Sequence, residues 1–196
     1  MAKNVDRAAA TRGRLLSVAR ALFAADGYAA TGTEAILDGA GVKRGALYHH
    51  FRDKAELFEA VCRELTEEAS AAIVAAAGRE TRAYDALVAG SLAWFDAMLR
   101  PDVRRILVIE APGVLGWERW NALDAQHGFG LLRQGVAAAL DEGSLIFDGD
   151  AGTLARLLNG AMNGAVVHAG AAGAGDVRAI RQGIAALIAA FRPARD

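Results

Sequence analysis

The sequence lacks the features of a secreted or membrane-spanning protein. Cys62 is the only cysteine among 196 residues, so no disulfide can form within the chain and a reducing compartment fits. No apolar run approaches the roughly 20 residues that a membrane-spanning helix needs. No apolar signal core follows the basic residues of the N-terminus. We therefore expect a soluble, cytoplasmic protein with no membrane partner.

Strand patterns are also missing, and only three prolines interrupt the chain. Apolar residues instead recur at helical spacing nearly everywhere. The sequence predicts an all-α protein of about nine helices, with a short second helix capped by Thr33, a break at Pro112-Gly113 and a loop over 169–175. The other expected helices span about 8–26, 44–51, 53–77, 82–99, 102–110, 116–142, 150–168 and 176–191. Asp53 with Glu56 and Asp150 are the expected caps of two of them.

The charge pattern gives only a weak indication of a nucleic-acid partner. The net charge is −1. Residues 1–60 carry nine Lys or Arg against seven Asp or Glu, with His49 and His50 in addition, whereas the remainder carries thirteen against sixteen. This distribution favours a mildly electropositive N-terminal face and no more.

The first three expected helices have the layout of a helix-turn-helix unit. A long helix is followed by two short ones, and Gly41 supplies the backbone freedom for a tight turn before the third. Apolar residues at matching positions form a candidate shared core: Leu22, Phe23, Ile36, Val42, Leu47 and Phe51. The third helix then presents small or basic residues at its start, which suits close approach to base edges and phosphates.

The stretch from Thr33 to Phe58 resembles the signature of the tetracycline-repressor (TetR) family. The matching motifs are Ala40-Gly41-Val42, Gly45-x-Leu47-Tyr48-x-x-Phe51, and Lys54 followed by Glu56-Leu57. The resemblance covers residues 8–60 closely, and beyond them it extends to length and helix pattern. It implies a helix-turn-helix DNA-binding domain over 1–55 and a ligand-binding and dimerisation domain over 56–196. It also implies a ligand-responsive repressor, acting as a homodimer on a palindromic operator in double-stranded DNA, and not an enzyme.

Site residues follow from the same resemblance. Tyr48, His49 and Lys54 are expected to contact phosphates, and Thr33 is expected to act at the N-terminus of the second helix, where free amides favour an anion. The residues expected to face the major groove are Lys43, Arg44, Gly45 and Ala46. Two positions depart from the family pattern, since Lys43 and Ala46 replace residues that commonly bear a hydroxyl. Taken singly, Tyr48 is also typical of a partly buried structural aromatic, and Lys54 of a solvated helix start.

The C-terminal part contains no P-loop, dinucleotide fingerprint or metal-ligand spacing, so no cofactor or metal is expected. It contains a concentration of aromatic residues with a few polar ones, which is typical of small-molecule pockets. With the resemblance, this predicts a pocket for a small, lipophilic effector, lined by Trp94, Phe95, Met98, Ile106, Glu110, Trp117, Trp120, His127, Met162 and Asn163. The alternative is that the tryptophans fill the core or an interface.

The last two expected helices carry apolar stripes, and Gly160 and Gly164 are spaced so that another helix can approach closely. The resemblance implies that these helices pair with their two-fold copies in a four-helix interface. The expected interface residues are Leu154, Leu158, Ala161, Ala165, Ile180, Ile184, Leu187 and Phe191. The alternative is an ordinary core within one chain.

Two rival functions remain open at this point. Asp124 and His127 lie three residues apart on one expected helix and could form a general acid/base pair, which would indicate an enzyme or carrier with a decayed helix-turn-helix. The second rival is a regulator that needs no ligand, in which the C-terminal part serves only dimerisation.

Overall fold

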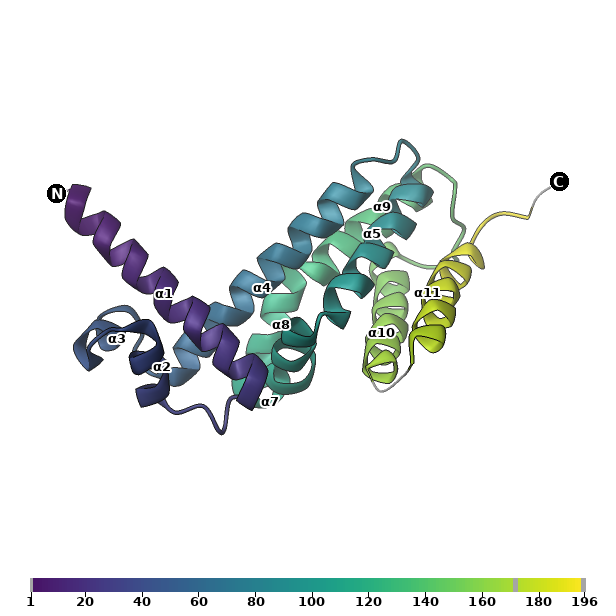
Figure 1. The fold of residues 1–196 in the computed structure, drawn as a ribbon. Helices are drawn as coiled ribbons and strands as arrows, with labels where there is room; N and C mark the ends of the chain where they lie inside the picture. The colour runs from purple at the N-terminus through teal and green to yellow at the C-terminus, as the bar shows by residue number, and fades with distance from the viewer. Residues whose placement is uncertain (1, 171–172, 195–196) are drawn as a thin grey trace. The chain divides into compact units, whose positions relative to one another are not determined.

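The computed structural model describes residues 2–170 and 173–194, and all regular elements within these ranges are helical. The expected all-α fold is confirmed. The chain forms two compact units (Figure 1). The first contains the residues up to Leu65 and the segment Pro101–Trp120, and the second contains Thr66–Arg100 and the described residues from Asn121 onward. None of the described helices is both long and apolar enough to cross a membrane.

The first unit is built on the N-terminal helices. Its elements are α1 (Ala2–Asp26), α2 (Thr33–Ala40), α3 (Arg44–His50), the first half of α4 (Lys54–Ala77), α6 (Pro101–Val103), the π-helix η1 (Arg104–Glu110), α7 (Ala111–Leu115) and the start of α8 (Trp117–Gln126). Fully buried side chains from several of these helices share one core, among them Leu15, Phe23, Ile36, Leu47, Phe58 and Ile106. The Phe23 and Phe58 rings meet edge to face at 5.1 Å, which joins α1 to α4.

The second unit is a layered helical bundle. It contains the rest of α4 and of α8, with α5 (Ala83–Leu99), α9 (Gly128–Asp141), α10 (Ala151–Ala169) and α11 (Ala174–Ala189). Helix α5 packs against α9, α10 and α11. Two glycines allow close approach: a Cβ atom at Gly90 would lie 3.3 Å from Cγ2 of Ile73, and one at Gly135 would lie 3.2 Å from Cδ1 of Leu87. Asp150 caps α10 as expected, because its carboxylate accepts a hydrogen bond from the backbone N–H of Thr153 at 2.9 Å.

The predicted break at Pro112-Gly113 is wrong. The chain stays helical from Pro101 to Leu115 and includes the π-helix η1. At the end of η1, the N–H of Ala111 bonds to the carbonyl of Ile106. Pro112 lies in the first turn of α7, where a missing N–H is tolerated. The helical run ends instead at Gly116, whose φ of +79° suits glycine.

The single helix expected over 116–142 is two helices. Helices α8 and α9 meet at His127, whose φ of −120° and ψ of −99° are not helical. Glycines at 128 and 130 weaken helix propensity on the far side of this break.

Three other helix starts also differ from the prediction. Helix α1 begins at Ala2, and α11 begins at Ala174 with Asp176 in its first turn. Gly32, rather than Thr33, is the N-cap of α2. The expected loop over 169–175 is therefore shorter, and its residues 171–172 lie outside the described ranges.

Candidate DNA-binding site and ligand cavity

The turn between α2 and α3 depends on Gly41. Its φ of +62° is left-handed, a conformation that side chains with a Cβ disfavour. The N–H of Gly41 bonds to the carbonyl of Asp38 at 3.2 Å, and the N–H of Val42 bonds to that of Leu37 at 3.1 Å. These bonds satisfy the last carbonyls of α2 in the glycine-dependent way common at helix ends. Leu47, fully buried, then fixes α3 against the core of the first unit.

The start of α3 faces solvent. Lys43, Arg44 and Gly45 are exposed, and a Cβ at Gly45 would meet no atom within 4 Å. Ala46 is half-buried. Arg44 is 67% exposed and lies 3.8 Å from the carboxylate of Glu34. Its guanidinium also lies 5.8 Å from the centre of the Tyr48 ring. The first turn of α3 therefore offers an accessible cationic group beside an aromatic ring.

The remaining expected contacts on α2 and α3 differ in accessibility. Tyr48 is 46% exposed, His49 is exposed, and Thr33 is half-buried in the first turn of α2. Burial lowers the pKa of the His50 imidazole, and the neighbouring His49 and Arg12 act in the same direction. His50 therefore contributes little positive charge near pH 7, and the cationic character of this face comes from Lys43 and Arg44.

Lys54 is engaged with the turn between α1 and α2. Its Nζ donates hydrogen bonds to the carbonyls of Tyr28 at 2.8 Å and Thr31 at 2.9 Å. The same ammonium lies 4.2 Å from the centre of the Tyr28 ring, within the range of a cation–π contact. An ammonium has three hydrogens to donate, so two of them hold this turn and one remains. Its contact with phosphate stays a prediction.

Replacing Lys54 by alanine is expected to lower the free energy of unfolding by about 2 kcal/mol, because two partly buried, charge-assisted bonds are lost. Urea denaturation checks this, with Lys43→Ala as the control, since Lys43 is exposed and its side chain makes no capping bond. If Lys54 also contacts phosphate, each lost contact lowers the slope of log affinity against log salt concentration by about one. A variant as stable as the parent would contradict the anchoring role.

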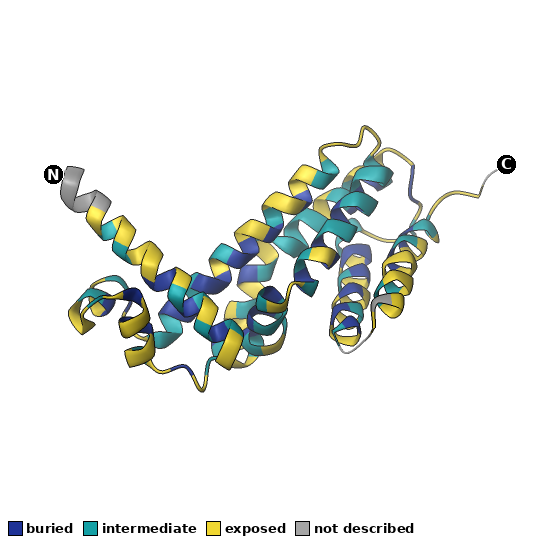
Figure 2. Ribbon diagram, viewed as in Figure 1, coloured by how far each residue is buried: buried dark blue, intermediate teal, exposed yellow. Residues whose placement is uncertain are grey.

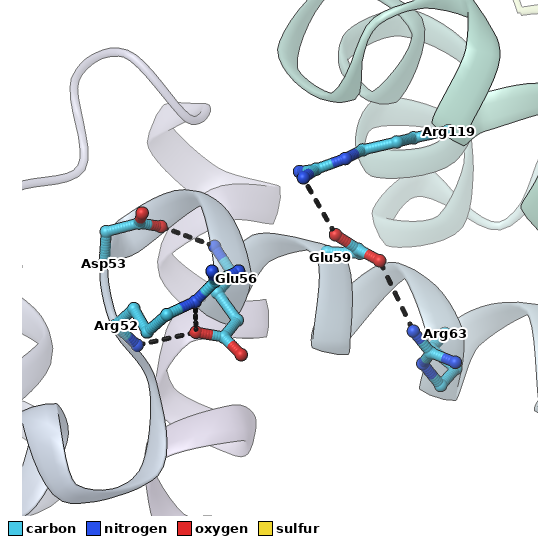
Figure 3. Close-up of polar contacts among 6 residues, drawn as sticks. All are labelled: Arg52, Asp53, Glu56, Glu59, Arg63 and Arg119. Atoms are coloured by element: carbon cyan, nitrogen blue, oxygen red, sulfur yellow. Dashed lines mark hydrogen bonds and ion pairs between the residues drawn. The ribbon is translucent and has the colours of Figure 1, made fainter.

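The start of α4 has the cap at Asp53 expected from its sequence, but Glu56 reaches back to Arg52 rather than to Asp53 (Figure 3). Oδ1 of Asp53 accepts from the N–H of Glu56 at 2.8 Å, and Oε2 of Glu56 accepts from the N–H of Arg52 at 2.6 Å and from its Nε at 3.0 Å. The backbone N–H of Arg52, followed by its guanidinium, holds the pKa of the Glu56 carboxyl below its ordinary value.

One turn further along α4, Glu59 lies between two arginines (Figure 3). Its carboxylate is 3.4 Å from Arg63 of the same helix and 3.6 Å from Arg119 of α8. Both arginines are more than half exposed while the Glu59 side chain is 30% exposed, so each pair contributes little to stability.

Side chains from α6 and η1 hold the C-terminal end of α1 and the turn that follows. Asp102 pairs with Arg20 at 2.7 Å, and Arg105 donates to the carbonyl of Ala25 at 2.9 Å. Glu110 accepts from the N–H of Tyr28 at 2.6 Å. Gly27 has a φ of +87°, which favours glycine, and a Cβ there would lie 2.4 Å from the Glu110 carboxylate and displace it. The expected placement of Glu110 in the ligand pocket is therefore corrected, because its carboxylate is committed to this turn.

A cavity of about 420 Å³ lies within the second unit. Its walls come from the C-terminal part of α4, from α5, α9 and α10, and from the residues that join α4 to α5. It is lined by Ile73, Val74, Ala77, Gly78, Ala83, Ala86, Leu87, Gly90, Ser91, Trp94, Gly128, Leu131, Leu132, Gln134, Gly135, Ala138, Asn159 and Met162. Of the residues predicted for the pocket, Trp94 and Met162 lie in this wall.

The other predicted pocket residues lie elsewhere. Phe95 and Met98 are buried in the second unit without reaching the cavity, and Asn163 is exposed on α10. Ile106, Trp117 and Trp120 belong to the first unit, where Ile106 is core and Trp117 is 71% exposed.

Asp124 and His127 are close in sequence to Gly128, which lines the cavity, but neither of them lines it. A Cβ at Gly128 would be 3.2 Å from Nε1 of Trp94 and 3.3 Å from Oδ1 of Asp124. Burial raises the pKa of the Asp124 carboxyl, while hydrogen bonds from the Asn159 side chain and the Phe129 backbone, with the charge of His127, act against it. Asn159, unlike Asp124, lines the cavity.

Helices α10 and α11 run side by side (Figure 1), and each has a buried and an exposed face (Figure 2). Three predicted interface residues, Leu154, Leu158 and Ile184, are buried within the chain itself, so they have little surface left for a partner. Ala161 and Leu187 are exposed, whereas Ala165, Ile180 and Phe191 are half-buried. Residues that were not predicted, Leu157 at 59% and Val167 at 62%, are the exposed apolar side chains of α10.

Comparisons with known proteins agree with this geometry. Residues 15–61 match the bacterial regulatory proteins of the tetR family, and residues 84–191 match the tetracyclin repressor-like C-terminal domain. The chain is 44% identical over 66 residues to an HTH-type transcriptional repressor of Mycobacterium tuberculosis, a match that covers 34% of this chain and 35% of that protein. It is 28% identical over 156 residues to the TetC protein of transposon Tn10 from Escherichia coli, covering 79% and 78% of the two chains.

Among solved structures, a TetR-family transcriptional regulator from Pectobacterium atrosepticum superposes with a TM-score of 0.76 at 25% identity, covering 97% of this chain and 98% of that one. The two family matches together span the DNA-binding head and most of the helical bundle. Homodimers and responses to ligands are typical of this group. The chain belongs to the TetR family of transcriptional regulators.

Proposed function

We propose that this protein is a homodimeric repressor in the cytoplasm, which binds a palindromic operator through residues 1–55 and is controlled by a small molecule bound within residues 56–196. The observation that carries the DNA-binding part is the start of α3. Lys43, Arg44 and Gly45 are exposed there, while Leu47 is buried and fixes the helix. A recognition helix needs this arrangement, since its N-terminal residues reach base edges and phosphates.

The proposed dimer surface is the exposed face of α10, which we call the α10 stripe. It consists of Leu157, Gly160, Ala161, Gly164 and Val167, and Leu187 is a further exposed apolar residue on α11. A Cβ at either glycine would meet no atom within 4 Å, so this face is open in the single chain. Exposed apolar side chains around small residues permit close packing of a two-fold copy. This surface replaces Leu154, Leu158 and Ile184 in the expected interface.

The proposed route from ligand to DNA runs along α4. Ile73, Val74 and Ala77, near its C-terminal end, line the cavity, and Lys54 at its first position holds the turn between α1 and α2. A ligand that favours one position of α4 therefore biases the turn between α1 and α2 that Lys54 holds. Such a ligand acts only through its different affinities for the two states, with a coupling of about 1–3 kcal/mol.

A reporter assay tests the repressor proposal. A promoter that contains an operator selected by the protein is joined to a reporter gene, and the chain is expressed beside it. Expression of the parent chain is expected to lower reporter output, whereas the turn variant Gly41→Val is expected to leave it unchanged because valine disfavours the left-handed turn. An increase in output with the parent chain would indicate an activator instead.

A further inference from the structure

The cavity also indicates the chemistry of the controlling ligand, an inference that rests on the proposed function. We propose that the ligand is an uncharged, largely apolar molecule that carries a hydroxyl or an equivalent hydrogen-bonding group. Three observations within the second unit carry this proposal: the uncharged wall of the cavity, a buried hydroxyl without a partner, and a side-chain amide in the same wall.

The wall of the cavity contains no ionisable side chain. Its residues are aliphatic or aromatic, apart from Ser91, Gln134 and Asn159. An ionised group that leaves water needs an opposite charge or several hydrogen bonds in return. This wall offers no opposite charge, because none of its residues is ionisable and Asp124 is not part of the lining. The cavity therefore selects against carboxylates and ammonium groups.

Ser91 supplies the polar group that a neutral ligand can reach. Its residue is 4% exposed, and its Oγ has no hydrogen-bond partner. A buried polar group without a partner is costly, so such groups in folded proteins are rare and require an explanation. Ser91 lies on α5 one turn before Trp94, and both line the cavity. A ligand hydroxyl or carbonyl in the cavity would give Ser91 Oγ the partner it lacks.

Asn159 supplies a second polar group in the wall of the cavity. Its side-chain amide can both donate and accept hydrogen bonds. A hydroxyl suits Ser91 and Asn159 alike, since it can also donate and accept. A pure hydrocarbon would leave Ser91 Oγ without a partner.

Three naphthalene derivatives of similar size test whether the ligand must be uncharged and whether it must carry a hydrogen-bonding group. They are neutral 2-naphthol, apolar 2-methylnaphthalene and ionised 2-naphthoate. Equilibrium dialysis against the full chain, without DNA, measures the dissociation constant of each at pH 7. We expect 2-naphthol to bind with a dissociation constant below about 100 μM. We expect 2-methylnaphthalene to bind about 10-fold more weakly, because buried polar groups stay unpaired, and 2-naphthoate about 100-fold more weakly.

A matched pair of serine variants tests whether the preference for 2-naphthol arises from the cavity. Ser91→Ala removes the hydroxyl that lines it, and we expect the preference for 2-naphthol over 2-methylnaphthalene to fall to about 3-fold or less. Ser70→Ala is the control, because Ser70 Oγ is also buried without a partner but does not line the cavity. That variant is expected to keep the preference of the parent chain.

Tighter binding of 2-naphthoate than of 2-naphthol would overturn the proposal, and so would absence of 2-naphthol binding or equal effects of the two serine variants. None of these results bears on operator binding, which is measured separately with DNA. Conversely, a chain that binds 2-naphthol as expected but selects no DNA sequence would retain the ligand inference and refute the repressor.

Discussion

Replacing Arg44 by alanine is expected to weaken operator binding by about 30-fold to about 10⁴-fold. The loss of one arginine contact to a base or phosphate costs about 1–3 kcal/mol, and a two-fold dimer loses it in both half-sites. Arg44 is suited to such a contact because its guanidinium is 67% exposed at the first position of α3. Gel-shift titrations at two salt concentrations measure the affinity and its salt dependence.

The stability of Arg44→Ala should be close to that of the parent chain. The contacts of Arg44 with Glu34 and Tyr48 are exposed, and exposed pairs contribute little. Arg79→Ala is a matched control, since Arg79 is an exposed arginine in the turn that follows α4. Equal operator affinity of the two variants would show that α3 does not enter the groove by its first turn.

Introducing glutamates at Leu157 and Val167 is expected to convert the dimer into monomers and to lower operator affinity by about 10³-fold or more. Both side chains lie on the α10 stripe with more than half of their surface exposed in the single chain. In the proposed dimer each glutamate would be buried without a partner, a costly arrangement that two-fold symmetry repeats. A monomer holds a single half-site, which leaves affinity near the non-specific level.

Sedimentation equilibrium at micromolar concentration measures the oligomeric state of this double variant. Ile146→Glu serves as the control, because Ile146 is also an exposed apolar residue, at 62%, and lies outside α10 and α11. That control is expected to stay dimeric and to bind the operator normally. A double variant that remains dimeric would place the interface on another surface.

Local sequence rules were sufficient to predict the helix-turn-helix and the caps of two later helices. The left-handed turn at Gly41, the burial of Leu47 and the cap at Asp150 each depend on residues within a few positions of one another. Such short-range rules act before the rest of the chain is placed. For this reason the order of the N-terminal helices, the turn at Gly41 and the caps at Asp53 and Asp150 agree with the prediction, whereas the start of α1 and the cap of α2 do not.

Contacts between distant residues could not be predicted in the same way. Asp102 and Glu110 meet partners 82 positions earlier in the chain, and this commits Glu110 to the turn after α1. Residues 101–120 consequently join the first compact unit, although the functional boundary was expected at residue 55. Helical periodicity indicates which face of a helix is apolar but not which helix covers it. The same limit explains why Trp94 lines the cavity whereas Trp117 is exposed.

Selection of genomic DNA fragments by the purified protein tests the central claim most directly. Two copies of α3, related by the two-fold axis of a dimer, require half-sites one helical turn apart, or a multiple of it, with about 10 base pairs per turn. The account predicts that the recovered fragments share an inverted repeat with this spacing, and that at the same protein concentration Arg44→Ala recovers far fewer of them. Recovery of no common sequence by the parent chain, or of unpaired half-sites alone, would contradict a dimeric, sequence-specific repressor.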